Sequence, residues 1–405
     1  MQRLRFVALI IWAVGVQVHE LMATLGIAVF AFASLPELLK VRSITLPVIE
    51  EWGPLFAFAT WSLLAPTLTG FPPDGSGVGR TLDWVTIPLV MLAAQSLTPG
   101  QWKWLAIASF VTLGLSCLVA GLQHFGWWPP LSAFAPLAHL PISFSRVYEP
   151  IADSSRFMGG GLLFHRLKFS HVSGLALVAV VVVARYSKHR ALLIALGLFG
   201  FIAVWLFPYA RMGAVAMTLS VGMTVVLVSP SPAKAFLFSG ALGLAAVLVV
   251  VAVPSLRARF AAGLTDQGSG QRSQHVAAGL EAVRQHPLAG VGPGQFRPSK
   301  FGGAQMAEHV KDNPGKAHNE FVSIAAETGI PGLVIFLATL GMLLKRARKP
   351  PMGAMAIGAI ALFVVLSMAH DPLYQAPFSM GLALIIGLGL GAPTPPALQT
   401  PYPRA

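Results

Sequence analysis

Residues 175–185 read LALVAVVVVAR, and this run decides the fold class of the chain. It is apolar up to its final arginine, and it does not alternate in polarity as a strand of a membrane barrel would. Backbone amides that face lipid must be hydrogen-bonded within a helix or a closed barrel. We therefore expect a transmembrane helix here.

Similar apolar runs recur along almost the whole sequence. Charged residues make up only 11% of the chain and hydrophobic residues 55%, and the mean hydropathy is +0.70. A soluble domain carries about 25% charged residues, whereas a bilayer span needs roughly 20 apolar residues. We predict an all-α polytopic membrane protein with about twelve transmembrane helices. The expected spans are 4–18, 21–39, 52–68, 81–97, 102–125, 172–186, 191–208, 212–228, 233–254, 321–344, 352–369 and 376–391.

The distribution of basic residues predicts the orientation of these spans. The net charge is +13. With both termini in the cytoplasm, the basic clusters at 185–190 and 345–349 face the cytoplasm, and the short outside loops carry only Arg80 and Arg211. This is the positive-inside bias of membrane proteins, so the basic excess does not indicate nucleic-acid binding. The first span is expected to be retained, because its apolar segment leads directly into the next one.

The spans divide the chain into four regions. Residues 1–256 hold spans one to nine and an outside loop at about 126–171. Residues 257–319 form a second outside region with short helices, and 320–391 hold the last three spans. Residues 392–405 are Pro-rich and are predicted to be a disordered cytoplasmic tail.

The second outside region and the span that follows it contain the most informative residues. Residues 285–296 read QHPLAGVGPGQF, 317–321 read AHNEF and 326–333 read AETGIPGL. The glycines permit turns, and since they follow no strand they do not predict a phosphate loop. His318 is either an interfacial polar residue or a proton acceptor that works near neutral pH. Glu327 is either a structural pairing residue or part of the site.

Arginines in the outside segments are candidates for binding phosphate groups. Arg211 lies where a short outside loop meets a span, so it is either a snorkelling anchor or a site residue that faces a cavity. A guanidinium matches pyrophosphate oxygens with paired hydrogen bonds. Among the other outside arginines we favour Arg146, in the polar run 143–149 (SFSRVYE).

The outside acids and histidines do not have the spacing of a metal site or of paired catalytic carboxylates. We therefore expect a metal-independent mechanism without a cofactor.

The pairing of HPLAGVGPGQF with the downstream HNEF and AETGIPGL resembles the O-antigen ligase and polymerase superfamily, over about residues 272–333. The resemblance implies a GT-C-like glycosyltransferase that uses glycans on undecaprenyl pyrophosphate. It implies that His318 is the catalytic base and that Arg211 and Arg272 bind the pyrophosphate. His275 and Val276 depart from the family, in which an aromatic residue often follows the second arginine.

The expected function is therefore glycan transfer to lipid A–core in lipopolysaccharide biosynthesis, inverting and metal-independent. It would occur at the periplasmic face of the bacterial inner membrane, with membrane lipids as further partners. An O-antigen polymerase and a protein O-oligosaccharyltransferase remain alternatives within the superfamily. A twelve-span transporter is the alternative of another class. It predicts broken helices with charged residues near mid-bilayer, whereas Arg211 and His318 lie at a boundary.

Overall fold

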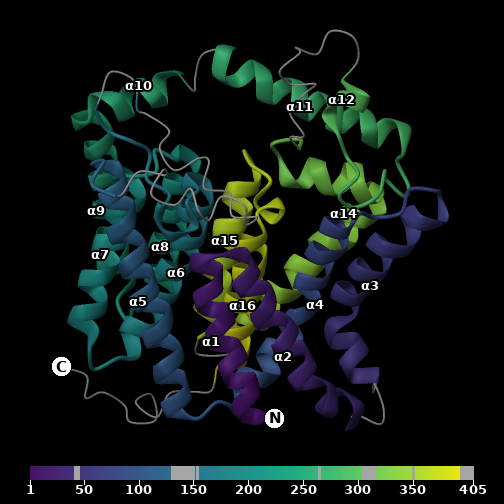
Figure 1. Ribbon diagram of the computed structural model, residues 1–405, viewed down its shortest axis with the longest axis horizontal. Helices are drawn as coiled ribbons and strands as arrows, with labels where there is room; N and C mark the ends of the chain where they lie inside the picture. Colours follow the sequence, from purple (N-terminus) through teal and green to yellow (C-terminus); the bar gives the residue numbers. More distant parts are fainter. Residues whose placement is uncertain are drawn as a thin grey trace.

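The computed structural model describes residues 1–40, 46–128, 151, 155–262, 266–302, 316–348 and 352–392. Twelve of its helices coincide with the expected spans, with ends that differ by a few residues (Figure 1). They are α1 (Gln2–Val18), α2 (Glu20–Lys40), α3 (Leu46–Leu68), α4 (Gly75–Ser96), α5 (Pro99–His124), α6 (Arg166–Tyr186), α7 (Arg190–Leu206), α8 (Arg211–Val228), α9 (Pro232–Ala252), α14 (Glu320–Ala347), α15 (Gly353–Ser367) and α16 (Ala376–Gly391).

Five of these helices, α5, α6, α8, α9 and α14, are long and apolar enough to cross a membrane. Shorter apolar stretches occur in α2, α7, α15 and α16. The chain is thus a multi-pass helical membrane protein, as its hydropathy predicted. That all twelve helices cross the bilayer stays a prediction, and so do the four regional boundaries.

Helix α16 packs against α4 and α15 at the centre of the bundle. Its glycines allow this close approach: a Cβ at Gly387 would lie 2.6 Å from Cβ of Val90, and one at Gly391 would overlap the carbonyl of Met91. Small residues serve this purpose in membrane helices because lipid supplies little hydrophobic drive between them. The packing fixes the connection between α15 and α16, which contributes to the site described below.

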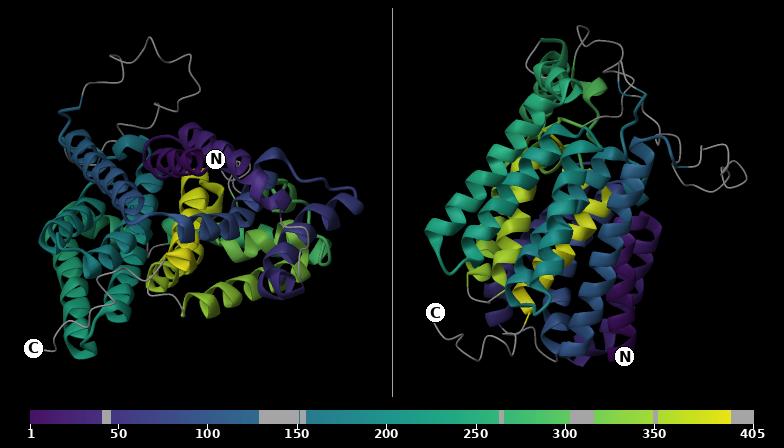
Figure 2. Two further views of the ribbon diagram at one scale, coloured as in Figure 1. Left: turned by 90° about the horizontal axis from the view of Figure 1, so that it is seen from below. Right: turned by 90° about the vertical axis from the view of Figure 1, so that its left-hand side faces the viewer.

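Three helices outside the expected spans lie across one end of the bundle. They are α10 (Pro254–Ala262), α11 (Asp266–Gln285) and α12 (Pro298–Phe301). Figure 1 shows them at the top and the N-terminus at the bottom, and the right-hand view of Figure 2 shows the same separation. Helix α11 packs on α14, so this end of the bundle also holds the start of α14.

Helix α4 begins six residues before the expected span. Asp74 caps it by accepting a hydrogen bond from the Gly77 amide at 2.7 Å. An aspartate at this position satisfies an amide that the first helical turn leaves free. Arg80, which was expected in a short outside loop, therefore lies on a helix.

Cysteine labelling tests the predicted orientation. The one native cysteine, Cys117, is buried and gives a low background. Cysteines placed at the exposed positions Lys188 and Arg348 should react only after the membrane is permeabilised, whereas one at Leu288 should react in intact spheroplasts. Labelling of Leu288→Cys from the cytoplasmic side alone would reverse the orientation.

Candidate active site

Basic side chains from several helices gather at the end of the bundle that holds α10 and α11. Arg166 begins α6, Arg211 begins α8 and Arg272 lies on α11. Arg272 and Arg166 are close enough to Arg211 to act on it electrostatically, and Arg272 also acts on His318. The structure thus brings together three of the four predicted site residues. Arg146, the fourth, lies outside the described residues.

Arg211 is held toward the protein by its neighbours on α10. Its Nη1 donates a hydrogen bond to the carbonyl of Arg259, and Nε of Arg259 donates to the carbonyl of Tyr209 at 3.0 Å. The Tyr209 hydroxyl lies 2.8 Å from Oγ of Ser255, which further secures the connection before α8. The Arg211 guanidinium is therefore half-buried and fixed by the protein, and its role as a site residue stays a prediction.

His318 lies just before α14 in an unusual backbone conformation. Its φ is +55°, in the left-handed region that is uncommon for residues other than glycine. Asp371 supports it: one carboxylate oxygen accepts the His318 amide at 2.7 Å, and the other accepts the Ser323 hydroxyl. Strain held by its surroundings is typical of functional positions.

The His318 ring is electrically neutral at pH 7. It contacts the ring of His275 edge to face, with 4.7 Å between centroids. Burial, together with His275 and Arg272, lowers the pKa of His318 to about 4. A neutral imidazole keeps a lone pair that can accept a proton or a hydrogen bond.

Two further histidines join the basic group, and the sequence did not predict them as site residues. The rings of His171 and His370 lie 5.5 Å apart between centroids. His171 is fully buried, and its Nδ1 lies 3.0 Å from Oε1 of Gln375, while its Nε2 has no hydrogen-bond partner among the described residues. Burial, His171 and Arg272 hold the pKa of His370 well below its usual value. Nothing in the sequence links these histidines, because they lie about 200 residues apart.

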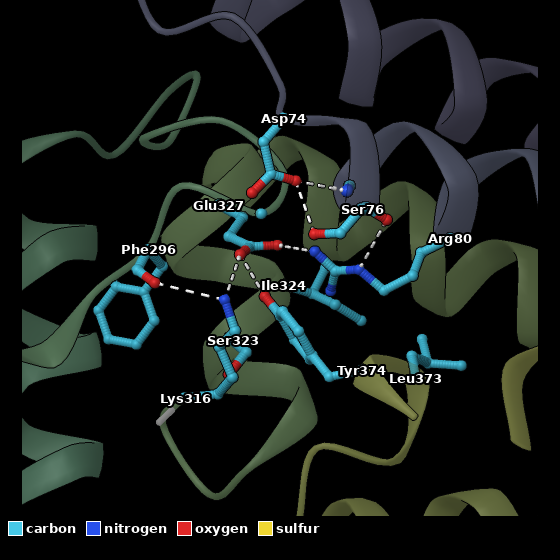
Figure 3. Close-up of polar contacts among 12 residues, drawn as sticks. Asp74, Ser76, Arg80, Phe296, Lys316, Ser323, Ile324, Glu327, Leu373 and Tyr374 are labelled. Atoms are coloured by element: carbon cyan, nitrogen blue, oxygen red, sulfur yellow. Dashed lines mark hydrogen bonds and ion pairs between the residues drawn. The ribbon is translucent and has the colours of Figure 1, made fainter. Parts of the chain in front are cut away.

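A second cluster of charged residues surrounds Glu327 and ties α4, α14 and the α15–α16 connection together (Figure 3). Glu327 Oε2 pairs with Nη2 of Arg80 at 3.1 Å, and its Oε1 accepts the Tyr374 hydroxyl and lies 4.0 Å from Nζ of Lys316. The Arg80 guanidinium also stacks over the Tyr374 ring at 3.5 Å. Glu327 is therefore a pairing residue, as the structural interpretation of the sequence proposed.

The glycine-rich loop fastens onto a break in α14. The helix is interrupted at Gly329, which has a φ of +73°. The carbonyls of Ala326 and Glu327, which precede the break, accept the amides of Val291 and Gly292, both at 2.9 Å. These bonds join the two parts of the motif and give the glycine-rich loop a structural role.

Removal of Arg80 should destabilise the protein strongly. The Arg80 and Glu327 side chains are only 14% and 4% exposed, and breaking a buried ion pair costs about 3–5 kcal/mol because one charge stays buried without its partner. We expect Arg80→Ala at the low end of this range, since Lys316 remains near Glu327. The matched control is Arg284→Ala, whose ion pair with Glu281 is solvent-exposed. Denaturation in detergent should separate the two variants, and equal stability would contradict the structural role.

The described residues include no group of three histidine, cysteine, aspartate or glutamate side chains that could hold a metal ion. The positive charges of the site are those of its arginines, which suit a phosphate-bearing ligand.

The fold and this site define a multi-pass helical membrane protein with a cluster of basic residues at one end of its helices. Residues 174–337 match the family model described as O-antigen ligase, and this segment contains Arg211, Arg272, His318 and Glu327. This match supports membership of the O-antigen ligase superfamily. A search of curated proteins returned no match.

Proposed function

We propose that the protein transfers a glycan from undecaprenyl pyrophosphate to lipid A–core at the periplasmic face of the bacterial inner membrane. The family match supports a ligase-type or polymerase-type role in lipopolysaccharide biosynthesis. The observation that carries the more specific proposal is that Arg272 lies close enough to act electrostatically on both Arg211 and His318. Guanidinium groups next to a neutral imidazole suit a diphosphate leaving group and a hydroxyl nucleophile.

In this mechanism a hydroxyl oxygen of the acceptor sugar attacks the anomeric carbon of the donor. The bond from that carbon to the pyrophosphate oxygen breaks, its electron pair leaves with undecaprenyl pyrophosphate, and a single displacement inverts the configuration. Arg211 and Arg272 stabilise the charge that develops on the leaving oxygen. His318 accepts the hydroxyl proton and later releases it to water.

The charges of the site also adjust the basicity of His318. With a pKa of about 4 the free imidazole is a weak base. A bound pyrophosphate would offset the field of Arg272, and an anion beside an imidazole raises its pKa. Donor binding would thus move His318 toward the range in which general bases are effective.

The superfamily alternatives share this chemistry and differ in the acceptor. An O-antigen polymerase would extend the glycan on its lipid carrier, and a protein O-oligosaccharyltransferase would use a hydroxyl side chain. A GT-C-like arrangement, with membrane helices below and the site at one end, accommodates each of them. The family match favours all of these over a transporter.

A reconstituted transfer assay tests the proposal. Purified protein in nanodiscs would receive undecaprenyl-pyrophosphate-linked glycan with lipid A–core, with a serine-containing acceptor peptide, or with no added acceptor. We expect product on lipid A–core alone. Longer glycan on the carrier would identify a polymerase instead, and glycosylated peptide would identify a protein-directed transferase.

Transfer should not depend on a divalent cation. The proposed charge stabilisation comes from Arg211 and Arg272, so EDTA is expected to leave the initial rate in the nanodisc assay unchanged. A control with EDTA already saturated with Mg²⁺ separates chelation from effects on the membrane. Loss of activity in EDTA that Mg²⁺ restores would contradict the metal-independent mechanism.

A further inference from the structure

A cavity of about 490 Å³ lies between α6, α7, α8 and α9, at the end of these helices away from Arg211. It lies against the last turns of α6 and α8, whereas the candidate active site lies at their starts. Its volume falls within the range of about 300–1,000 Å³ that is usual for ligand sites. The walls are mainly apolar, and they include Val181, Ile194, Phe201, Val225, Phe238 and Leu242.

Three basic residues border this cavity: Arg185, Arg190 and Lys234. Nε of Arg185 donates a hydrogen bond to the carbonyl of Val228 at 3.3 Å, so this side chain supplies a partner to a backbone carbonyl at the end of α8. Arg190 and Lys234 have no ion-pair partner among the described side chains. Both lie in the first turn of a helix, where a cation opposes the helix dipole. Their positions therefore do not serve helix stability.

We propose that this cavity binds an anionic glycerophospholipid, with its phosphate between Arg190 and Lys234 and an acyl chain along the apolar walls. The cavity wall on α6 extends from Leu177 to Arg185, which at 1.5 Å per residue is about 12 Å of depth. Cations at one end of the cavity and apolar side chains along the rest match the headgroup and the acyl chains of such a lipid.

The neighbouring helix packing gives the lipid a structural role. Helix α9 buries only Ala235 and Ala246, and it packs mainly on α8. The lipid would fill the space between α7 and α9 and hold α9 in place. This role is separate from glycan transfer at the opposite end of the helices.

Native mass spectrometry of the purified protein tests the proposal by titration with dioleoyl phosphatidylglycerol and, separately, with dioleoyl phosphatidylcholine. The wild type should bind phosphatidylglycerol more tightly. Arg190→Gln and Lys234→Gln should each weaken that binding roughly fivefold, as expected for the loss of one cation near an anionic lipid. The matched control is Lys188→Gln, which removes an exposed cation from the same α6–α7 connection but does not line the cavity.

Gly197→Leu tests the cavity without altering its charge. A Cβ at Gly197 would lie 3.5 Å from Cγ1 of Val180, an ordinary contact, so the larger side chain should extend into the cavity and reduce the binding of both lipids. Equal affinity for the two lipids would overturn the proposal, and so would an equal effect of Lys188→Gln and Arg190→Gln. Displacement of phosphatidylglycerol by stoichiometric undecaprenyl phosphate would assign the cavity to a prenyl chain instead.

Discussion

Arg211→Ala is expected to lower the rate of glycan transfer by about 10²–10³-fold, the usual cost of removing one well-placed donor of transition-state charge stabilisation. Arg272→Ala should act in the same direction, because Arg272 lies close enough to influence both Arg211 and His318. Lysine at either position should restore only part of the rate, since an ammonium keeps the charge and loses the paired hydrogen bonds. Initial rates in the nanodisc assay measure the effect.

Controls separate this loss from a structural defect. Arg211 also donates to the Arg259 carbonyl, so each variant must retain the detergent-extracted yield and unfolding temperature of the wild type. Arg284→Ala removes a solvent-exposed arginine of α11 and should leave transfer intact. Full activity of Arg211→Ala would make Arg211 an interface anchor, and the pyrophosphate site would then have to be sought among Arg146, Arg257 and Arg259.

His318→Ala is expected to reduce transfer by about 10²–10⁴-fold, the usual contribution of a general base. His318→Gln and His318→Asn refine the test, because an amide can hydrogen-bond the acceptor hydroxyl but cannot take its proton near neutral pH. Asparagine also tolerates the left-handed backbone that His318 adopts, so it separates loss of the base from backbone strain. A rate close to that of the wild type in either amide variant would show that His318 only positions the acceptor.

The twelve long helices could be predicted from the sequence, because a long apolar stretch of residues is itself the requirement for a helix that lies in lipid. The start of α4 could not be predicted from the sequence, because Gly75, Gly77 and Gly79 are poor helix formers. In the structure the cap at Asp74 offsets their low helix propensity. Because the start of α4 was missed, Arg80 was expected in a short outside loop. Its pairing with Glu327 could not be predicted either, since the two residues lie 247 positions apart in the sequence.

The candidate site could be predicted only in part. The proximity of Arg211, Arg272 and His318 followed from family resemblance, since no spacing rule joins residues on α8, α11 and the start of α14. His171 and His370 were missed because a buried histidine within or beside an apolar run has no distinguishing pattern. Their contact depends on how α6 packs against α15 and α16, which is a property of the bundle as a whole.

Photo-crosslinking with undecaprenyl pyrophosphate that carries a diazirine beside the diphosphate tests whether Arg211 and Arg272 bind the donor. We expect labelled peptides that contain Arg211, Arg272 or His318, and competition by unmodified undecaprenyl pyrophosphate. Arg284→Ala should label like the wild type, and Arg211→Ala should label weakly. Labelling confined to the opposite end of the helices, at peptides that contain Arg190 or Lys234, would contradict the assignment of the pyrophosphate site.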